Sequence, residues 1–339
     1  MKQLKTAILG LDDKGELLLE AAYQSGYFEI VAAADKDLAL CEKASTKYNC
    51  AVFDDYRQLI TQNQVDCLLT AAGTYSCGEY LRAAIKKKFN IFKLSPLARN
   101  FTEATEFVQL CESENVKLAV SNPYRFAESF SAMNSFIAGG GIEQIFLINA
   151  VCIFGQPYPI WQNDPKQSGG GVLIRNCYQI IDQILWNFGL PQQVYSLNSN
   201  NASDKQQRLS LTEDTATLTI KINETCFGNL TASRRPGMGP KQEFIDIYGK
   251  NKILRVSDMK FSVMEGSGLI KEEFDYKDSK HACMVKSLEN FAQSISAPDK
   301  VKLFNSGHEN LKNMAVVEAA YLSARTGMPE QPERILQMA

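Results

Sequence analysis

A loop near the amino terminus carries two of the three glycines of a dinucleotide-binding fingerprint. Gly10 and Gly15 occupy the first and third positions of Gly-x-Gly-x-x-Gly, which serve a tight turn and the close packing of the following helix. The middle position is Asp12, whose side chain narrows the approach of a pyrophosphate and whose charge repels it. Asp12 or Asp13 could instead cap the helix and occupy the amides that a phosphate would use.

An acidic residue follows the second expected strand. Asp35 lies 20 residues beyond Gly15, the position from which a carboxylate binds the ribose hydroxyls of NAD. The same aspartate could equally be an ordinary turn or cap residue. Lys36 beside it would favour the 2′-phosphate of NADP, whereas the charge of Asp35 opposes that phosphate. The sequence therefore leaves the choice between NAD and NADP open.

Histidine and cysteine offer little further chemistry. The chain has only two histidines, His281 and His308, so few positions could serve a histidine-dependent mechanism. Both histidines are expected near the starts of helices. Its nine cysteines are widely spaced and include no Cys-x-x-Cys pair. We therefore expect reduced thiols in a cytoplasmic protein and no metal site.

The composition is that of an ordinary globular protein with two domains. At 339 residues the chain is long enough for two hydrophobic cores. Basic and acidic residues nearly balance, with a formal net charge of −2, which argues against a nucleic-acid partner found by bulk electrostatics. No apolar run is long enough to cross a membrane, so we expect no membrane partner.

The first third of the chain alternates between strand-like and helix-like patterns. Short apolar runs predict strands over residues 5–10, 28–35, 51–53, 65–72, 90–94 and 116–120, and helices are expected over 16–24, 38–48, 55–61, 78–88 and 101–113. Apolar runs without polar alternation are typical of strands buried on both faces of a parallel sheet. Residues 1–121 are therefore expected to form an α/β, Rossmann-like, doubly wound domain.

The pattern changes in residues 122–339. Strands are expected over residues 144–154, 193–199, 215–222, 229–234, 243–248 and 253–256, with a hairpin turn at 249–251. One long helix is expected over 172–188, and a closing helix near 309–326 that ends at Gly327. This domain is expected to be α+β, with a large and mainly antiparallel sheet.

Four landmarks in this order resemble the glucose–fructose oxidoreductase, inositol dehydrogenase and MocA family. They are Asp35, Pro-Leu-Ala at 96–98, Gly-Gly-Gly at 169–171, and the closing segment EAAYLSARTG at 318–327. The resemblance covers nearly the whole chain. It implies an oxidoreductase that uses NAD or NADP on a sugar, polyol or cyclitol carbinol, and a homo-oligomer formed through the C-terminal sheet.

The resemblance also implies which residues surround the cofactor. Where the family has Thr-Pro-Asn and then a histidine after the fourth strand, this chain has Ala72, Gly73 and Thr74 and then Cys77. The lysine of the family's Glu-Lys-Pro is replaced by Ser95, which cannot supply an ammonium. The expected cofactor contacts are Gly10, Asp12, Gly15, Asp35, Ala72, Gly73 and Pro96.

A nearby lysine offers one replacement for the missing ammonium. Lys93 lies two positions before Ser95 and would point to the same side of an extended strand. It could take over the ammonium role, or it could be an ordinary surface lysine.

The helix after the glycine triplet is the third altered place. The family's substrate-facing Asp and His correspond here to Arg175 and Gln179, and Asp182 would share their helix face. Gln179 cannot act as a general base, and Arg175 stays protonated. Arg175 could hold an anionic ligand, or pair with Asp182 or another carboxylate. Tyr178 could titrate in their place, although a tyrosine on a packed helix is usually a core residue.

The substrate pocket implied by the resemblance therefore comprises Arg125, Arg175, Gln179 and Asp182. Arg125 falls where the family carries an arginine near the domain junction. Two functions remain open. One is a redox enzyme with altered acid–base residues; the other is a non-catalytic binding or assembly protein that retains the oxidoreductase fold.

Overall fold

The chain forms two compact units. The structure, a computed structural model, describes residues 2–155, 164–200, 212–234, 239–265, 269–277 and 280–338. The first unit comprises residues 1–98, 102–123 and 279–310, and the second comprises residues 99–101, 124–278 and 311–339. The segment 279–310 thus returns to the first unit, which a boundary near residue 122 does not anticipate.

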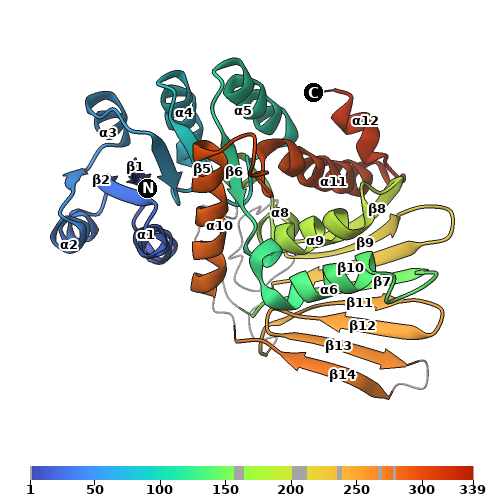
Figure 1. The fold of residues 1–339 in the computed structure, drawn as a ribbon. Helices are drawn as coiled ribbons and strands as arrows, with labels where there is room; N and C mark the ends of the chain where they lie inside the picture. The colour runs from blue at the N-terminus through green and yellow to red at the C-terminus, as the bar shows by residue number, and fades with distance from the viewer. Residues whose placement is uncertain are drawn as a thin grey trace. The chain divides into compact units, whose positions relative to one another are not determined.

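The first unit is built on a six-stranded parallel sheet, with strand order β3-β2-β1-β4-β5-β6 (Figure 1). Its strands are β1 (Leu4–Leu9), β2 (Phe28–Ala34), β3 (Ala51–Phe53), β4 (Cys67–Thr70), β5 (Asn90–Leu94) and β6 (Leu118–Ser121). Helices α1 (Asp13–Ser25), α2 (Leu38–Tyr48), α3 (Tyr56–Gln62), α4 (Thr74–Lys86) and α5 (Phe101–Ser113) connect them. The predicted Rossmann-like, doubly wound fold is confirmed, because this order is the one that forms a nucleotide crevice where it reverses beside β1.

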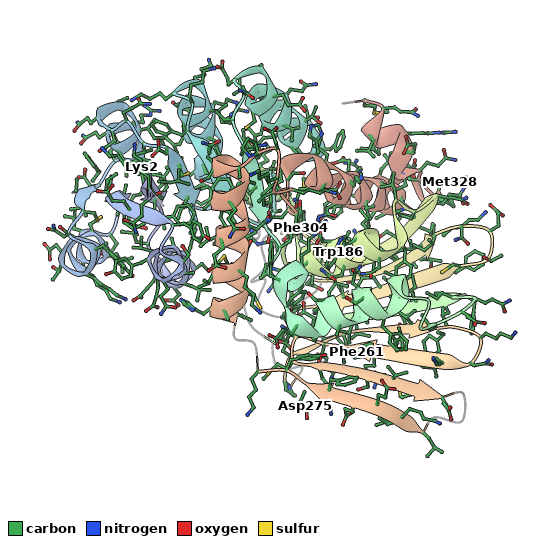
Figure 2. The ribbon with its side chains drawn as sticks, viewed as in Figure 1. Lys2, Trp186, Phe261, Asp275, Phe304 and Met328 are labelled. Atoms are coloured by element: carbon green, nitrogen blue, oxygen red, sulfur yellow. The ribbon has the colours of Figure 1, made fainter. Side chains whose placement is uncertain are left out.

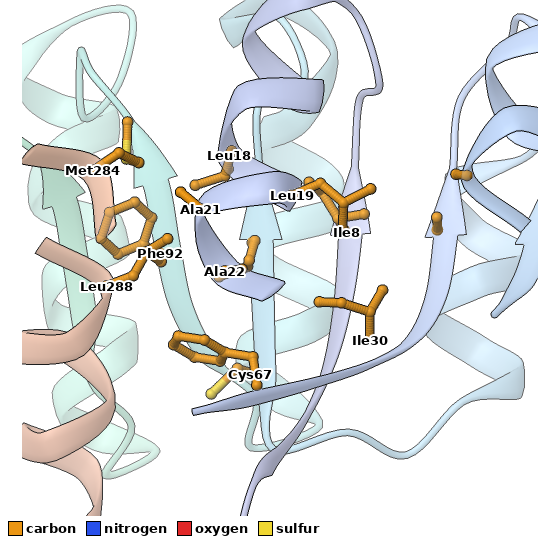
Figure 3. Packing of buried hydrophobic residues seen from close by; sticks show 14 of the residues in the cluster. Ile8, Leu18, Leu19, Ala21, Ala22, Ile30, Cys67, Phe92, Met284 and Leu288 are labelled. Carbon is orange, nitrogen blue, oxygen red and sulfur yellow. The ribbon is translucent and has the colours of Figure 1, made fainter. Parts of the chain in front are cut away.

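A helix from late in the chain completes the core of this unit. Helix α10 (Lys280–Ser296) packs against α1, and its Met284 and Leu288 join a buried cluster with Phe92 of β5 and Leu18 of α1 (Figure 3). The residues of this cluster are almost completely shielded from water. The amphipathic pattern of α10 therefore reflects packing on the Rossmann-like sheet.

The second unit is built on an eight-stranded sheet with the order β14-β13-β12-β11-β7-β10-β9-β8 (Figure 1). Its strands are β7 (Leu147–Ile153), β8 (Gln193–Ser199), β9 (Thr215–Lys221), β10 (Phe227–Ser233), β11 (Gln242–Tyr248), β12 (Lys252–Val256), β13 (Lys260–Glu265) and β14 (Ile270–Asp275). Strands β7 and β10 are parallel, and the other neighbours are antiparallel. The predicted mainly antiparallel sheet is confirmed.

Several elements of the second unit were not predicted from the sequence. The longest of them are α6 (Glu128–Ala138), β13 and β14. Every residue of β14 is exposed and four of the six are charged, so this edge strand has no buried face that the sequence pattern could reveal. Strand β14 is held in the sheet by its antiparallel backbone pairing with β13, not by a buried side-chain face.

The predicted long helix over 172–188 is wrong, because the chain forms two helices there. Helix α8 (Val172–Arg175) ends before α9 (Tyr178–Phe188) begins. The carbonyl of Val172 accepts hydrogen bonds from the amides of both Asn176 (2.9 Å) and Cys177 (3.1 Å), which widens the turn. Such a widened turn breaks the regular i to i−4 ladder, and residues before and after it no longer share one helix face.

The remaining helical elements frame this sheet and the chain end. They are η1 (Pro123–Phe126), α7 (Pro165–Ser168), α11 (Gly307–Thr326) and α12 (Pro332–Leu336). Helices α6 and α8 contact one face of the sheet, where alternate residues such as Leu218 of β9 are buried. The opposite face carries exposed apolar side chains, including Leu197 of β8 and Phe227 of β10. The expected closing helix is α11, and Gly327 follows it with a φ of 70°.

Candidate functional site

The glycine loop closes tightly against the end of β4. Gly10 has a φ of 87°, and a Cβ added to it would lie 2.7 Å from the amide nitrogen of Ala72. A Cβ on Gly15 would lie 2.0 Å from the carbonyl oxygen of Gly10. Both positions therefore require glycine for packing of the β1–α1 turn. The segment at Ala72 and Gly73, which was expected beside the cofactor, forms one wall of this turn.

Asp12 is the residue that caps helix α1. Its Oδ1 accepts hydrogen bonds from the amides of Lys14 and Gly15, both at 3.1 Å. These amides belong to the first turn of the helix, whose unpaired N–H groups and positive dipole end would otherwise attract a phosphate. A fixed carboxylate therefore stands at the place where the fold would hold a pyrophosphate.

Asp35 binds the same loop from the end of β2. Its Oδ2 accepts a hydrogen bond from the amide of Leu11 at 2.7 Å, and its Oδ1 accepts one from the amide of Asp37 at 3.0 Å. Asp35 therefore orders the loop through two backbone amides, and its contact with a ribose stays a prediction. A carboxylate has about four lone-pair sites, so two remain for ribose hydroxyls.

The residues present therefore fit a nicotinamide dinucleotide at its ribose end. The glycine turn has the closely packed backbone of the dinucleotide fingerprint, and Asp35 retains acceptor capacity. At the pyrophosphate end, the Asp12 carboxylate opposes the ligand by charge. When bound, the dinucleotide would accept or donate the hydride, and the protein would position the reacting alcohol or carbonyl.

The interpretation of Lys93 as a surface lysine is wrong. Lys93 is only 2% exposed, and its Nζ donates hydrogen bonds to the carbonyl oxygens of Pro96 (2.7 Å) and Leu94 (3.1 Å). The ammonium thus binds the backbone of the turn that follows β5, next to half-buried Ser95. The backbone doubles back after β5, so these carbonyls meet the lysine that precedes them. Lys93 positions this turn.

A buried ion pair organises the start of the second unit. Nε and Nη2 of Arg125, on η1, donate to the two carboxylate oxygens of Asp182 at 2.8 and 2.7 Å. Asn313 of α11 donates to Oδ1 of Asp182 at 2.9 Å. The guanidinium also lies 5.6 Å from the ring centre of Trp186, which Figure 2 labels on α9. Asp182 therefore pairs with Arg125, and the expected pairing of Asp182 with Arg175 is not the one formed.

The other residues expected at the substrate pocket lie around the break between α8 and α9. Arg175 is the last residue of α8, and Gln179 lies in the first turn of α9; both are half-buried. Because the helix is interrupted between them, the spacing of four residues does not place them on one face. Tyr178 is 1% exposed, as expected of a core tyrosine. The roles of these residues toward a substrate remain predictions.

Sequence reasoning missed a charged cluster at the start of β11. Tyr124 of η1 donates a hydrogen bond to the carboxylate of Glu243, and the ammonium of Lys241 pairs with Glu243 and, at 3.6 Å, with Asp258. Burial, together with the Glu243 charge, raises the pKa of Tyr124. Burial acts to lower the pKa of Lys241, but the charges of Glu243 and Asp258 outweigh it and raise that pKa. Tyr124 and Lys241 are 117 residues apart, so no local sequence signal could have joined them.

Two further features bear on the kind of site this is. Within the described ranges, no group of three or more His, Cys, Asp or Glu side chains is arranged to hold a metal ion. The same residues contain no helix that is long and apolar enough to cross a membrane.

The fold and these sites define a two-unit α/β protein with the architecture of nicotinamide-dependent dehydrogenases. Residues 4–122 match the oxidoreductase family described by its NAD-binding Rossmann fold (GFO_IDH_MocA). Residues 135–331 match the C-terminal alpha/beta domain of that family. The chain belongs to this oxidoreductase family, so the resemblance read from its sequence is confirmed.

Individual relatives are distant. The chain is 20% identical to the uncharacterized oxidoreductase YrbE of Bacillus subtilis over 348 residues, which covers 100% of this chain and 99% of the relative. It is 21% identical to myo-inositol 2-dehydrogenase of Thermotoga maritima, over 58% of each chain.

Solved structures show the same fold. A levoglucosan dehydrogenase in complex with NADH and levoglucosan superimposes with a TM-score of 0.86 at 15% identity, covering 97% of this chain and 99% of the other. An oxidoreductase from Agrobacterium radiobacter in complex with NAD+, L-tartaric acid and magnesium gives a TM-score of 0.83 at 18% identity, with 98% and 100% covered.

Proposed function

We propose that this protein binds NAD(H) or NADP(H) through its first unit and a sugar-, polyol- or cyclitol-like molecule through its second. The observation that carries the proposal is the closed turn of Gly10 and Gly15, with the Asp35 carboxylate at the end of β2. Relatives named as an inositol dehydrogenase and as a complex with NADH and levoglucosan support both ligand classes. Asp35 favours NAD over NADP, because its charge opposes a 2′-phosphate.

We further propose that any redox reaction proceeds slowly, because the acid–base groups of the family are replaced. Ser95 supplies no ammonium, Gln179 cannot exchange a proton, and Lys93 is committed to two backbone carbonyls. Losing a positioned proton relay typically costs about 10²–10⁴-fold in rate. The protein would therefore turn over a carbinol far more slowly than a relative that retains the lysine and histidine.

One observation favours a second candidate function, a non-catalytic binding or assembly protein. Neither Tyr178 nor Arg175 takes over the lost proton exchange. Tyr178 is buried in the core, and Arg175 lies on α8, a different helix from that of Gln179. An assembly role would use the exposed face of the eight-stranded sheet, through which we propose that the chain forms a homo-oligomer.

Restoring the family's residues separates the two candidates. We expect the wild-type chain to show little or no NAD- or NADP-dependent turnover across a panel of sugars and cyclitols. A variant carrying Ser95→Lys, Arg175→Asp and Gln179→His should raise turnover by about 10²-fold or more if ligands already bind productively. Binding of NADH and a polyol without turnover in either protein would favour the non-catalytic function. Rapid wild-type turnover would contradict the proposed loss of acid–base catalysis.

A further inference from the structure

The glycine triplet of the second unit packs against a buried glutamate and a tyrosine. A Cβ on Gly170 would lie 2.0 Å from Oη of Tyr321, and a Cβ on Gly171 would lie 1.8 Å from the carbonyl oxygen of Glu213. These contacts explain why glycine stands at both positions. The triplet is therefore needed for the approach of Glu213 and Tyr321 to the start of helix α8.

Glu213 forms the centre of a rigid polar network. Its Oε2 accepts a hydrogen bond from the amide of Gly171 at 2.8 Å, and its Oε1 accepts bonds from the amide of Leu173 at 3.0 Å and from the hydroxyl of Tyr321 at 2.9 Å. Glu213 is 6% exposed, and burial raises its pKa. A buried network whose members all have partners is fixed in place.

A cavity of about 480 Å³ lies over this network. Its lining includes Gly170, Glu213 and Tyr321, together with Asn198 of β8 and Glu318 and Arg325 of α11. The volume lies within the range of roughly 300–1,000 Å³ that is usual for small-molecule sites. All the residues that line it belong to the second unit, and neither Arg175 nor Gln179 is among them. The cavity is therefore distinct from the altered positions of the oxidoreductase site.

The polar groups of the cavity suit hydroxyl groups better than an anion. Tyr321 donates its proton to Glu213, so its oxygen presents lone pairs as acceptors. Oδ1 of Asn198 accepts a hydrogen bond from Ser196 at 2.8 Å, which orients the amide nitrogen of Asn198 as a donor. Arg325 lies 3.8 Å from Glu318, and its charge is thereby offset. With Glu213 and Glu318 against one arginine, the cavity carries excess negative charge when both carboxyls are ionised.

We propose that this cavity is a second ligand site, which binds a neutral or cationic hydroxyl-rich small molecule such as a sugar or an amino sugar. It goes beyond the proposed function, because it requires neither the nicotinamide dinucleotide nor the residues that face the redox chemistry. Acceptors from Glu318 and Tyr321 and donors from Asn198 and Arg325 would bind the hydroxyls. An anionic sugar would meet the like charge of Glu318 without a dedicated cation.

Calorimetric titration of the full chain tests this site directly. The probes are D-glucose, D-glucosamine and D-glucuronate, each titrated without any nicotinamide dinucleotide. We expect D-glucose and D-glucosamine to bind and D-glucuronate to bind at least about tenfold more weakly, because like charges oppose it. Glu318→Gln should narrow the difference between D-glucosamine and D-glucuronate.

Substitution of residues on β8 places the binding within the cavity. Asn198→Trp should fill it and weaken D-glucose binding by about tenfold or more, equivalent to about 1.4 kcal/mol. Gln193→Trp, an equally exposed change on the same strand but outside the cavity, should leave the affinity within about twofold.

Three results would overturn the proposal. They are the absence of binding by both neutral and cationic probes, equal effects of Asn198→Trp and Gln193→Trp, and binding of D-glucuronate as tight as that of D-glucosamine. Failure of the proposed function would show separately, as an absence of NADH binding, and would leave these titrations unaffected.

Discussion

The Asp35 carboxylate accepts a 2.7 Å hydrogen bond from the amide of Leu11, so the end of β2 is tied to the glycine loop. On the other side of that loop, Asp12 caps helix α1. Two carboxylates therefore order the segment on which a dinucleotide would lie. Asp35 retains acceptor capacity for a ribose, whereas the Asp12 charge faces a pyrophosphate. The loop is thus ordered by its own hydrogen bonds, but its electrostatics oppose the anionic part of a dinucleotide.

Lys93→Met tests whether the buried ammonium positions the turn after β5. The substitution removes the donor to the carbonyls of Leu94 and Pro96. Leaving buried acceptors unsatisfied should lower the free energy of unfolding by about 1–3 kcal/mol. Denaturant unfolding measures this loss, with Lys250→Met, at an exposed lysine, as the control that should change it little. Equal losses in both variants would show that Lys93 has no structural role.

Asp182→Asn tests the buried ion pair of the second unit. Arg125 would be left inside the protein without its counter-charge, so we expect a loss of about 3–5 kcal/mol in the free energy of unfolding. Asp246→Asn is a matched control, because Asp246 is also buried but its partner Arg255 is half-exposed. The control should cost markedly less, since the Arg255 charge stays solvated. A second variant, Arg125→Met with Asp182→Leu, should recover much of the loss.

The pH dependence of stability should report on Glu213. Burial raises its pKa in the folded state above the ordinary glutamate value of 4.5, so the folded protein binds its proton more tightly than the unfolded chain. The resulting stability is fully present below pH 4.5 and is lost as pH rises through the raised pKa. The free energy of unfolding of the wild type should fall as pH rises across this window. The part of that fall that is due to Glu213 should be absent in Glu213→Gln. Parallel curves would contradict the assignment.

The exposed face of the eight-stranded sheet should mediate self-association. Phe227 of β10 is 46% exposed on this face, and a charge there would meet a like charge across a two-fold interface. We expect sedimentation to show an oligomer for the wild type and a shift toward monomer for Phe227→Glu. Tyr23→Glu, at an exposed tyrosine of α1, should not change the state. A wild-type monomer would contradict this prediction.

The sequence predicted the architecture well because the signals were local. Apolar runs such as residues 65–72 mark strands that the structure buries on both faces, and the alternation in β9 marks a sheet with one buried face. The cap at Asp12 was among the predicted alternatives because capping depends on residues two and three positions away.

The sequence failed where the decisive partner is distant or is backbone. The partner of Asp182 is Arg125, 57 residues away, and the cluster of Tyr124 and Lys241 spans 117 residues. The partners of buried Lys93 are backbone carbonyl groups, and a pattern of side-chain types in the sequence does not reveal such partners. The break after Arg175 arises from a widened backbone turn and contradicts the local helical pattern.

The most direct test of this account is a calorimetric titration of NADH into the wild type, Asp12→Gly and Asp35→Ala. We predict that the wild type binds NADH, that Asp12→Gly binds it about tenfold or more tightly because a like charge at the pyrophosphate is gone, and that Asp35→Ala weakens it. Asp37→Ala, which removes only the cap of α2, should leave the affinity unchanged. Absence of NADH binding by both the wild type and Asp12→Gly would contradict the account.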